Sequence, residues 1–202
     1  KEEYILSDKL EFTNEPYAIA KISGIKMCEN YFRQYGCNFF SVMPTNLYGP
    51  GDNYDLESSH VIPGLIRKFY EAKINNQNSV KLWGSGRPLR EFLHVDDMAN
   101  ACIYLMENLD SNIIYENFRT SQLNIGTGKD ISIKQLAETI QDIINYDCEI
   151  IFDKTKPDGT YQKLLDTNKA DEIGWKYSIS LREGLKKTID DFKKNIDKYC
   201  SE

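Results

Sequence analysis

The chain has 202 residues and a mass of 23.4 kDa, enough for one large domain or two small ones. Apolar residues make up 41% and charged residues 28%, a mixture typical of soluble globular proteins that excludes a collagen-like or wholly disordered chain. The net charge of −6 argues against a nucleic-acid partner, and no run approaches the roughly 20 apolar residues needed to cross a bilayer.

The predicted elements begin with a polar, charged lead-in loop over residues 1–12. A helix follows from residues 13–16, where a capping residue, an acid and a proline coincide, and it runs to about Tyr35 before Gly36 ends it. Its apolar positions are spaced for a buried face: Ile19, Ile22, Ile25, Met27 and Tyr31.

Short strands and helices alternate through the rest of the chain. Residues 38–43 predict an apolar strand that Pro44 stops, and residues 47–53 are dense in turn formers and predict a surface loop. Ser58 or Ser59 is the expected cap of the second helix. That helix ends near residue 73, and further helices are predicted over 97–107 behind an Asp96 cap, 132–145, a short stretch from 167, and 180–195. Further strands are predicted over 80–83, 91–95, 122–125 and 149–152. This alternation predicts an α/β layered architecture.

The five cysteines are widely spaced and include no C-x-x-C pair, so we expect neither a disulfide framework nor a structural zinc site. Free thiols are typical of a reducing cytosol, and we expect a cytoplasmic protein without a metal. Because the first residue is Lys1 rather than methionine, we interpret the chain as a fragment or a processed product.

Tyr17 and Lys21 lie four residues apart, so both side chains face the same way from one helix. An ammonium group held beside a phenol favours the phenolate, and such a pair can exchange a proton with a substrate oxygen. The spacing alone fits a solvated Tyr–Lys pair as well, so the sequence context has to decide between them.

Five motifs supply that context: residues 14–21, 43–50, 59–63, 83–86 and 89–98. With these motifs in this order, the chain resembles the extended short-chain dehydrogenase/reductases that act on nucleotide sugars, and within them the GDP-L-fucose synthases. The resemblance runs from about Asn14 to the last helix. A reductase of another nucleotide sugar fits residues 59–63 and 43–46 less well.

The resemblance implies an NADPH-dependent enzyme that epimerises C3 and C5 of GDP-4-keto-6-deoxymannose and reduces its C4 ketone to give GDP-L-fucose. Tyr17 would protonate the C4 oxygen, Lys21 would bind the nicotinamide ribose and tune Tyr17, and His60 would be an acid/base in epimerisation. NADP(H) contacts are implied for Tyr17, Lys21, His60, Pro44, Thr45, Asn46 and Leu47. A homodimer is implied through helices that include the Tyr17 helix.

Four further residues are candidates for holding the GDP moiety: Lys68, Trp83, Arg90 and Asp158. A guanidinium fork suits a pyrophosphate, an indole offers a flat face, an ammonium can reach a phosphate, and a carboxylate can accept from a ribose hydroxyl. Each has a structural alternative. These are a surface salt bridge for Arg90, a core position for Trp83, a solvated helix face for Lys68 and a turn aspartate for Asp158.

The two histidines differ in their expected roles. His60 follows two serines at a helix start, so a local hydrogen-bonding role is the alternative to catalysis. His94 lies inside a predicted strand and is interpreted as structural. Asp96 and Asp97 follow it, and neighbouring aspartates at a helix start cap the helix more often than they bind a metal.

The chain departs from the family pattern in its first part. Residues 84–86 lack the third glycine of a dinucleotide-binding loop, and the serine and cysteine that the family carries upstream of the tyrosine have no match. We therefore interpret the chain as the C-terminal two-thirds of such an enzyme, inactive by itself. Residues 1–55 would complete a Rossmann-like domain, and residues 56–202 would mainly form a nucleotide-sugar-binding α/β domain, with 91–107 as a segment that could return to the first. The alternative is a stand-alone module that binds a GDP-sugar or a protein partner without turnover.

Overall fold

A computed structural model describes residues 1–200 of the chain. The chain forms two compact units, each built from three separate segments. The first unit contains residues 1–45, 97–128 and 165–177, and the second contains residues 46–96, 129–164 and the chain from 178 onward. The division therefore does not follow one boundary at residue 55. The cofactor and nucleotide-sugar roles of the two parts stay predictions.

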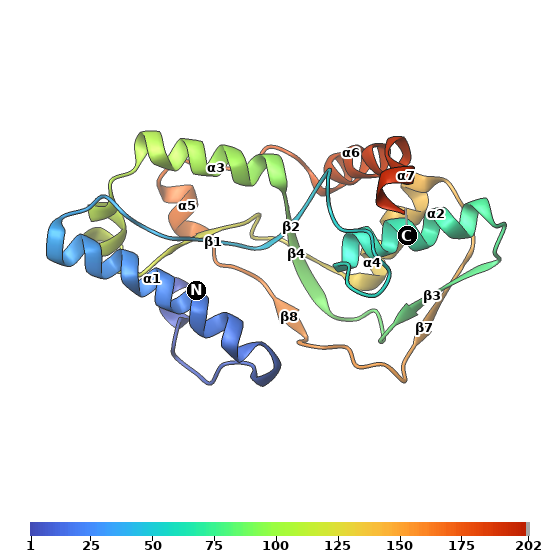
Figure 1. Cartoon of the computed structure of the whole chain (residues 1–202), viewed down its shortest axis with the longest axis horizontal. Helices are drawn as coiled ribbons and strands as arrows, with labels where there is room; N and C mark the ends of the chain where they lie inside the picture. Colours follow the sequence, from blue (N-terminus) through green and yellow to red (C-terminus); the bar gives the residue numbers. More distant parts are fainter. Residues whose placement is uncertain (201–202) are drawn as a thin grey trace. The chain divides into compact units, whose positions relative to one another are not determined.

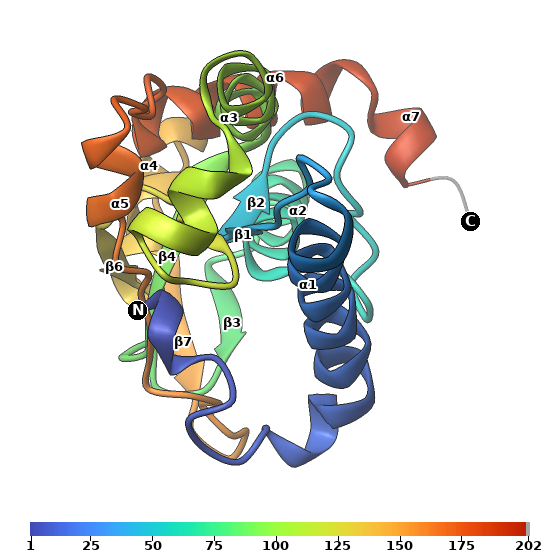
Figure 2. The same ribbon diagram turned by 90° about the vertical axis from the view of Figure 1, so that its left-hand side faces the viewer.

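The first unit pairs two short parallel strands and surrounds them with helices (Figures 1 and 2). Its elements are η1 (Glu2–Tyr4), η2 (Phe12–Asn14), α1 (Glu15–Tyr35), β1 (Val42–Pro44), most of α3 (Val95–Asn108), the π-helical turn η3 (Ile113–Asn117), β5 (Leu123–Ile125) and α5 (Asn168–Glu172). The first residues are not a loose lead-in loop. The Glu2 side chain is buried, accepts from the Asn124 N–H and pairs with the Lys169 ammonium at 3.0 Å.

Helix α1 buries less of its apolar surface than its sequence predicts. Ile25 and Glu29 are its buried residues, whereas Ile19, Met27 and Tyr31 are exposed. At 100° per residue, Met27 and Tyr31 lie on the side of the helix opposite Ile25, so one packed strip cannot hold all five predicted positions. The expectation of a single buried face is therefore wrong within the described residues.

The second unit is organised around β4, which has neighbours on both edges. Its elements are β2 (Asn46–Tyr48), α2 (Val61–Ile74), β3 (Ser79–Trp83), β4 (Leu89–His94), β6 (Asp130–Ser132), α4 (Ile133–Ile144), β7 (Glu149–Asp153), β8 (Gln162–Lys163), α6 (Leu181–Lys194) and α7 (Ile196–Tyr199). Strands β2 and β8 run parallel to β4, β6 runs antiparallel, and β3 pairs with β7 in parallel. Helices α2, α4 and α6 lie together (Figure 1) and share one core, which includes Phe69, Ile140 and Phe192. The predicted α/β class is confirmed.

Several predicted boundaries are wrong. The strand predicted over 38–43 covers Val42–Pro44 instead, so Pro44 ends β1 as one of its residues. The proline lacks an N–H, but at the end of a two-stranded pair this loss is tolerated. Strand β2 falls where the turn-forming residues predicted a loop, because its N–H and C=O groups pair with β4.

The helix ends also differ from expectation. His60 is the N-cap of α2 in place of Ser58 or Ser59, and α3 starts directly after β4, so Asp96 lies inside α3. The last predicted helix, 180–195, corresponds to α6, and the short helix α7 follows it after Asn195. None of the helices in residues 1–200 combines the length and apolar character that a membrane span requires.

A close approach at Gly184 predicts a stability effect. A Cβ there would lie 2.1 Å from the Tyr48 hydroxyl oxygen and 2.9 Å from the His94 ring, and both rings are buried and cannot retreat. Gly184→Ala gains about 1 kcal/mol of helix propensity but overpacks at a cost of about 1–3 kcal/mol, so we expect a net loss of up to about 2 kcal/mol in unfolding free energy. Urea unfolding measures it.

The matched control is Gly24→Ala in α1, where an added Cβ meets no atom within 4 Å. It should stabilise the protein by up to about 1 kcal/mol. Stabilisation by both changes would show that Tyr48 does not constrain Gly184.

Candidate active site

Tyr17 and Lys21 project from α1 of the first unit as an exposed pair. The Lys21 ammonium lies 5.4 Å from the centroid of the Tyr17 ring, and 61% of Tyr17 is exposed. Within residues 1–200, neither side chain donates a hydrogen bond to another residue. Both polar ends are therefore available to a ligand, as the proton-transfer hypothesis requires.

His60 belongs to the second unit, at the start of α2. Its backbone is extended (φ −71°, ψ 171°), and its imidazole forms no capping bond with the helix N-terminus. In the described part of the chain the imidazole has no hydrogen-bond partner, although its carbonyl accepts from the Gly64 N–H at 3.0 Å. The local hydrogen-bonding role is thus not observed.

The four predicted cofactor contacts at residues 44–47 belong to both units: Pro44 and Thr45 to the first, Asn46 and Leu47 to the second. Pro44 ends β1, and the Thr45 N–H donates to the Ile125 carbonyl in the first unit. In the second unit the Asn46 amide donates to the Glu91 carbonyl at 2.8 Å, and Leu47 is 37% exposed. The Asn46 side chain therefore uses one of its N–H groups in a hydrogen bond within the second unit.

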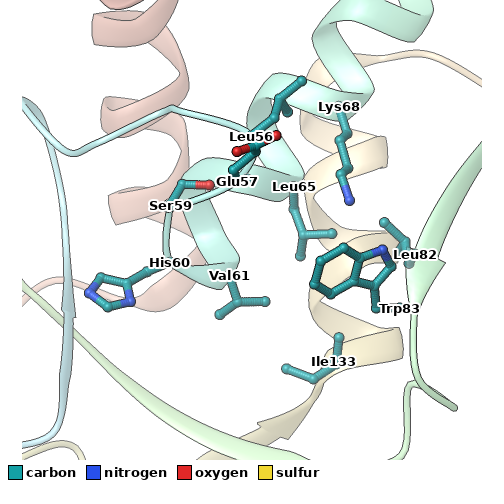
Figure 3. Close-up of a pocket in the computed structure, with 11 residues that line it drawn as sticks. Leu56, Glu57, Ser59, His60, Val61, Leu65, Lys68, Leu82, Trp83 and Ile133 are labelled. Carbon is teal, nitrogen blue, oxygen red and sulfur yellow. The ribbon is translucent and has the colours of Figure 1, made fainter. Parts of the chain in front are cut away.

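A pocket of about 280 Å³ lies in the second unit between the start of α2 and the end of β3 (Figure 3). Its lining residues are Leu56, Glu57, Ser59, His60, Val61, Gly64, Leu65, Lys68, Leu82, Trp83 and Ile133. Figure 3 shows the Lys68 ammonium directed toward the Trp83 indole, whereas the His60 imidazole points away from it. Three predicted site residues from two elements therefore line one pocket.

Trp83 is not a core residue, because 66% of it is exposed. Two ammonium groups lie near its ring, Lys68 at 5.8 Å and Lys156 at 5.5 Å from the centroid. Burial lowers the pKa of Lys68, so this amine is not on a fully solvated helix face. Lys156 is not among the sequence-predicted residues, although it directly precedes the Pro-Asp-Gly turn that contains Asp158. An exposed aromatic ring with two cations near it is suited to a planar, anionic ligand.

Arg90 is the second residue of β4, with β6 on one side and β8 on the other. The side chain is half-buried, donates to the Leu89 carbonyl at 2.7 Å, and forms no ion pair with any residue among 1–200. Burial lowers the pKa of its guanidinium. A desolvated cation without a carboxylate partner argues against the surface salt bridge and favours an anionic ligand. Lys163 of β8 occupies the neighbouring register position.

Asp158 has a structural task. Its two carboxylate oxygens accept from the Ser85 N–H at 2.5 Å and from the Ser85 hydroxyl at 2.7 Å, and the backbone bond lowers the pKa of Asp158. Gly84 has φ +80°, and a Cβ there would lie 2.4 Å from the carboxylate, so glycine is required. These contacts favour a turn aspartate that joins the loop carrying Lys156 to the turn after Trp83.

Residues 1–126 match the family model described as the NAD dependent epimerase/dehydratase family. The chain belongs to this family. The matched segment includes every predicted site residue except Asp158.

Relatives of this epimerase/dehydratase-family chain include a GDP-L-fucose synthase of Escherichia coli, 52% identical over 98% of the chain. A GDP-L-fucose synthetase of Naegleria fowleri bound to NADP has a TM-score of 0.85 and 30% identity over 98% of the chain. A GDP-mannoheptose C4 reductase from Campylobacter jejuni with NADP bound has a TM-score of 0.85 and 35% identity over 96%. The chain spans 62%, 61% and 64% of these proteins, respectively.

Proposed function

We propose that the protein carrying this chain is an NADP(H)-dependent GDP-L-fucose synthase, which epimerises GDP-4-keto-6-deoxymannose at C3 and C5 and reduces C4. The observation that carries the proposal is the exposed Trp83 indole with the ammonium groups of Lys68 and Lys156 near its ring. It offers a stacking face and cations for a nucleoside diphosphate. The 52% identity to the Escherichia coli enzyme supports this choice of nucleotide sugar.

Arg90 supplies the second cationic anchor for the diphosphate. A Cβ added at Gly159 would lie 3.7 Å from the Arg90 guanidinium. The loop that carries Lys156 and Asp158 therefore also reaches Arg90. The guanidinium has N–H groups beyond the one that bonds to the Leu89 carbonyl. A diphosphate oxygen is the acceptor that these donors lack within the described residues.

The residues of α1 fit the nicotinamide ribose end of NADP(H). A ribose diol needs a donor and acceptor set, and the exposed Tyr17 hydroxyl and Lys21 ammonium provide it with no competing partner in residues 1–200. Tyr17 and Lys21 would hold this end of the cofactor. When bound, the cofactor supplies the hydride for C4 reduction.

Tyr17 and His60 then divide the proton transfers. His60, with an imidazole free of intrachain hydrogen bonds, removes or returns a proton at the carbons beside the ketone during epimerisation. Tyr17 donates a proton to the C4 oxygen during reduction, and the Lys21 ammonium stabilises the resulting phenolate. The two sets of chemistry thus use separate groups.

The rest of the proposal concerns the units and the assembly. The first unit would carry the cofactor contacts of α1, and the second the nucleotide-sugar pocket. The protein would act in the cytoplasm as a homodimer that pairs through α1. The exposed apolar side chains of Ile19, Met27 and Tyr31 support this pairing. Light scattering gives the mass in solution.

A second candidate is a C4 reductase that does not epimerise. The similarity to the Campylobacter jejuni GDP-mannoheptose C4 reductase favours it, since that protein covers nearly the same residues of this chain. A third is a module that binds a GDP-sugar without turnover. Product analysis separates the three.

The test uses the protein of full natural length with GDP-4-keto-6-deoxymannose and NADPH. GDP-L-fucose as the product supports the proposal. A sugar reduced at C4 without inversion at C3 and C5 would favour the second candidate, and binding without NADPH oxidation would favour the third.

Arg90→Ala should weaken GDP binding by about tenfold to a hundredfold, because a charge-assisted pair to phosphate contributes about 1.5–3 kcal/mol. Arg90→Lys should restore only part of this loss, since an ammonium lacks the planar fork. Calorimetric titration of GDP measures the affinities, and circular dichroism checks the fold.

Arg182→Ala is the matched control, because Arg182 pairs with Asp142 on the helices of the same unit. It should leave GDP affinity within about twofold of wild type. Equal affinity for Arg90→Ala and the control would leave Trp83, Lys68 and Lys156 as the anchors.

A further inference from the structure

The loop between β2 and α2, residues 49–59, leads directly into His60 and forms one wall of the pocket. Leu56, Glu57 and Ser59 of this loop line the pocket. The loop has no regular secondary structure beyond turns, so its position depends on contacts made by its side chains and isolated N–H groups. What holds this loop determines where the imidazole of His60 lies.

An aromatic cluster anchors the middle of the loop. The Tyr54 ring is 1% exposed and lies 4.5 Å from the ring of Phe192 in α6 and 4.8 Å from the ring of Tyr199 in α7. The Phe192 and Tyr199 rings are stacked at 6.3 Å with only 8° between their planes. Three rings from three parts of the sequence thus form one packed cluster, and α7 follows directly from α6 (Figure 2).

Polar contacts fix the same loop at two more points. One carboxylate oxygen of Asp191 accepts from the Tyr199 hydroxyl at 2.7 Å and from the Gly51 N–H at 3.2 Å. The Arg67 guanidinium donates to the Tyr54 carbonyl at 3.1 Å and pairs with Glu71 within α2 at 2.7 Å. The loop is therefore tied to α6, α7 and α2, the helix whose N-cap is His60.

We infer that helices α6 and α7 position His60 for its proton transfer through this clamp, with Tyr199 as the positioning residue. Tyr199 contacts Tyr54 by its ring and, through Asp191, the Gly51 N–H by its hydroxyl. Tyr199 is not itself among the residues that line the pocket. The inference rests on the proposed function, because it assigns Tyr199 to the epimerisation half of that reaction.

The geometry gives an uneven expectation for the two half-reactions. Loss of the clamp displaces the loop at His60, and a misplacement of about 1 Å of a catalytic group can cost on the order of 100-fold in rate. Tyr17 lies on α1 in the first unit, whereas the clamp residues belong to the second unit. Epimerisation should therefore fall while the capacity for C4 reduction remains.

The test is Tyr199→Leu in the protein of full natural length, with Tyr199→Phe as the milder variant that keeps the ring. Solvent deuterium entry at C3 and C5 should fall by about 10- to 100-fold in Tyr199→Leu and by less in Tyr199→Phe. The product should shift toward sugar reduced at C4 without inversion. The KM for the substrate is measured beside kcat.

The matched control is Tyr146→Phe, which removes a hydroxyl bond to the Gln77 carbonyl in the same unit. It should leave the product ratio unchanged. A fall of both half-reactions in parallel in Tyr199→Leu, with a constant product ratio, would make Tyr199 a merely structural residue and overturn the inference.

Amide hydrogen exchange of residues 49–60 gives a readout without substrate. Tyr199→Leu should raise exchange in this segment, and Tyr146→Phe should not. Unchanged exchange overturns the clamp whatever the activity. The wild-type protein could also show no epimerisation while Tyr199→Leu still raises amide exchange in residues 49–60. That result would overturn the proposed function and the catalytic part of the inference but would support the clamp.

Discussion

Tyr17→Phe is expected to lower C4 reduction by about 10²–10⁴-fold, the usual effect of losing a general acid. Phenylalanine keeps the ring beside the Lys21 ammonium but removes the only proton that the side chain can give. Epimerisation should continue, so deuterium from the solvent should still enter at C3 and C5. NADPH oxidation and mass spectrometry of the sugar measure the two processes separately.

Tyr31→Phe is the matched control for this variant. Tyr31 lies on the same helix, is 44% exposed, and its hydroxyl has no hydrogen-bond partner in the described part of the chain. Its loss should leave both processes unchanged. If deuterium exchange in Tyr17→Phe disappeared together with reduction, Tyr17 would not have the separate role proposed for it.

The second large effect is expected for His60→Asn, which should reduce deuterium entry at C3 and C5 by about 10²–10⁴-fold. Asparagine is polar and similar in size but cannot exchange a proton near neutral pH. Since the imidazole makes no capping bond, α2 should keep its start, and circular dichroism and GDP affinity should match wild type. The product should be the C4-reduced sugar without inversion.

The two variants make opposite predictions, and this contrast tests the division of labour. Tyr17→Phe should exchange deuterium without reducing the ketone, whereas His60→Asn should reduce it without exchange. Full deuterium entry in His60→Asn would contradict a catalytic role for His60 and favour a local structural one.

Sequence alone was sufficient for the α/β class and for the residues that carry the resemblance. Alternating short apolar runs and capped amphipathic segments depend on local chemistry, and Ser132 and Ser180 cap α4 and α6, each within a capping box. The Tyr17–Lys21 proximity also follows from helix geometry, because residues four apart share a face in any α-helix.

The strand positions needed the tertiary structure. The turn-forming residues within 47–53 predicted a loop there, yet residues 46–48 form β2 because β4 offers hydrogen-bond partners for their backbone. Strand pairing depends on a partner distant in the chain, and a local pattern carries no information about it. Strands β6 and β8 were not predicted for the same reason, and they are only three and two residues long.

The candidate site also combines features that the sequence predicted with features that only the tertiary structure shows. The sequence named Trp83 and Arg90 but left each with a structural alternative, and the proposals for both rest on their burial and neighbours. Trp83 is exposed with the ammonium groups of Lys68 and Lys156 near its ring, 15 and 73 positions away in the chain, and Arg90 is half-buried without an ion-pair partner within residues 1–200. For Asp158 the contacts favour the structural alternative, because both carboxylate oxygens accept hydrogen bonds from Ser85. Desolvation and pairing arise between segments remote in sequence, so only the tertiary structure could supply the observations on which these proposals rest.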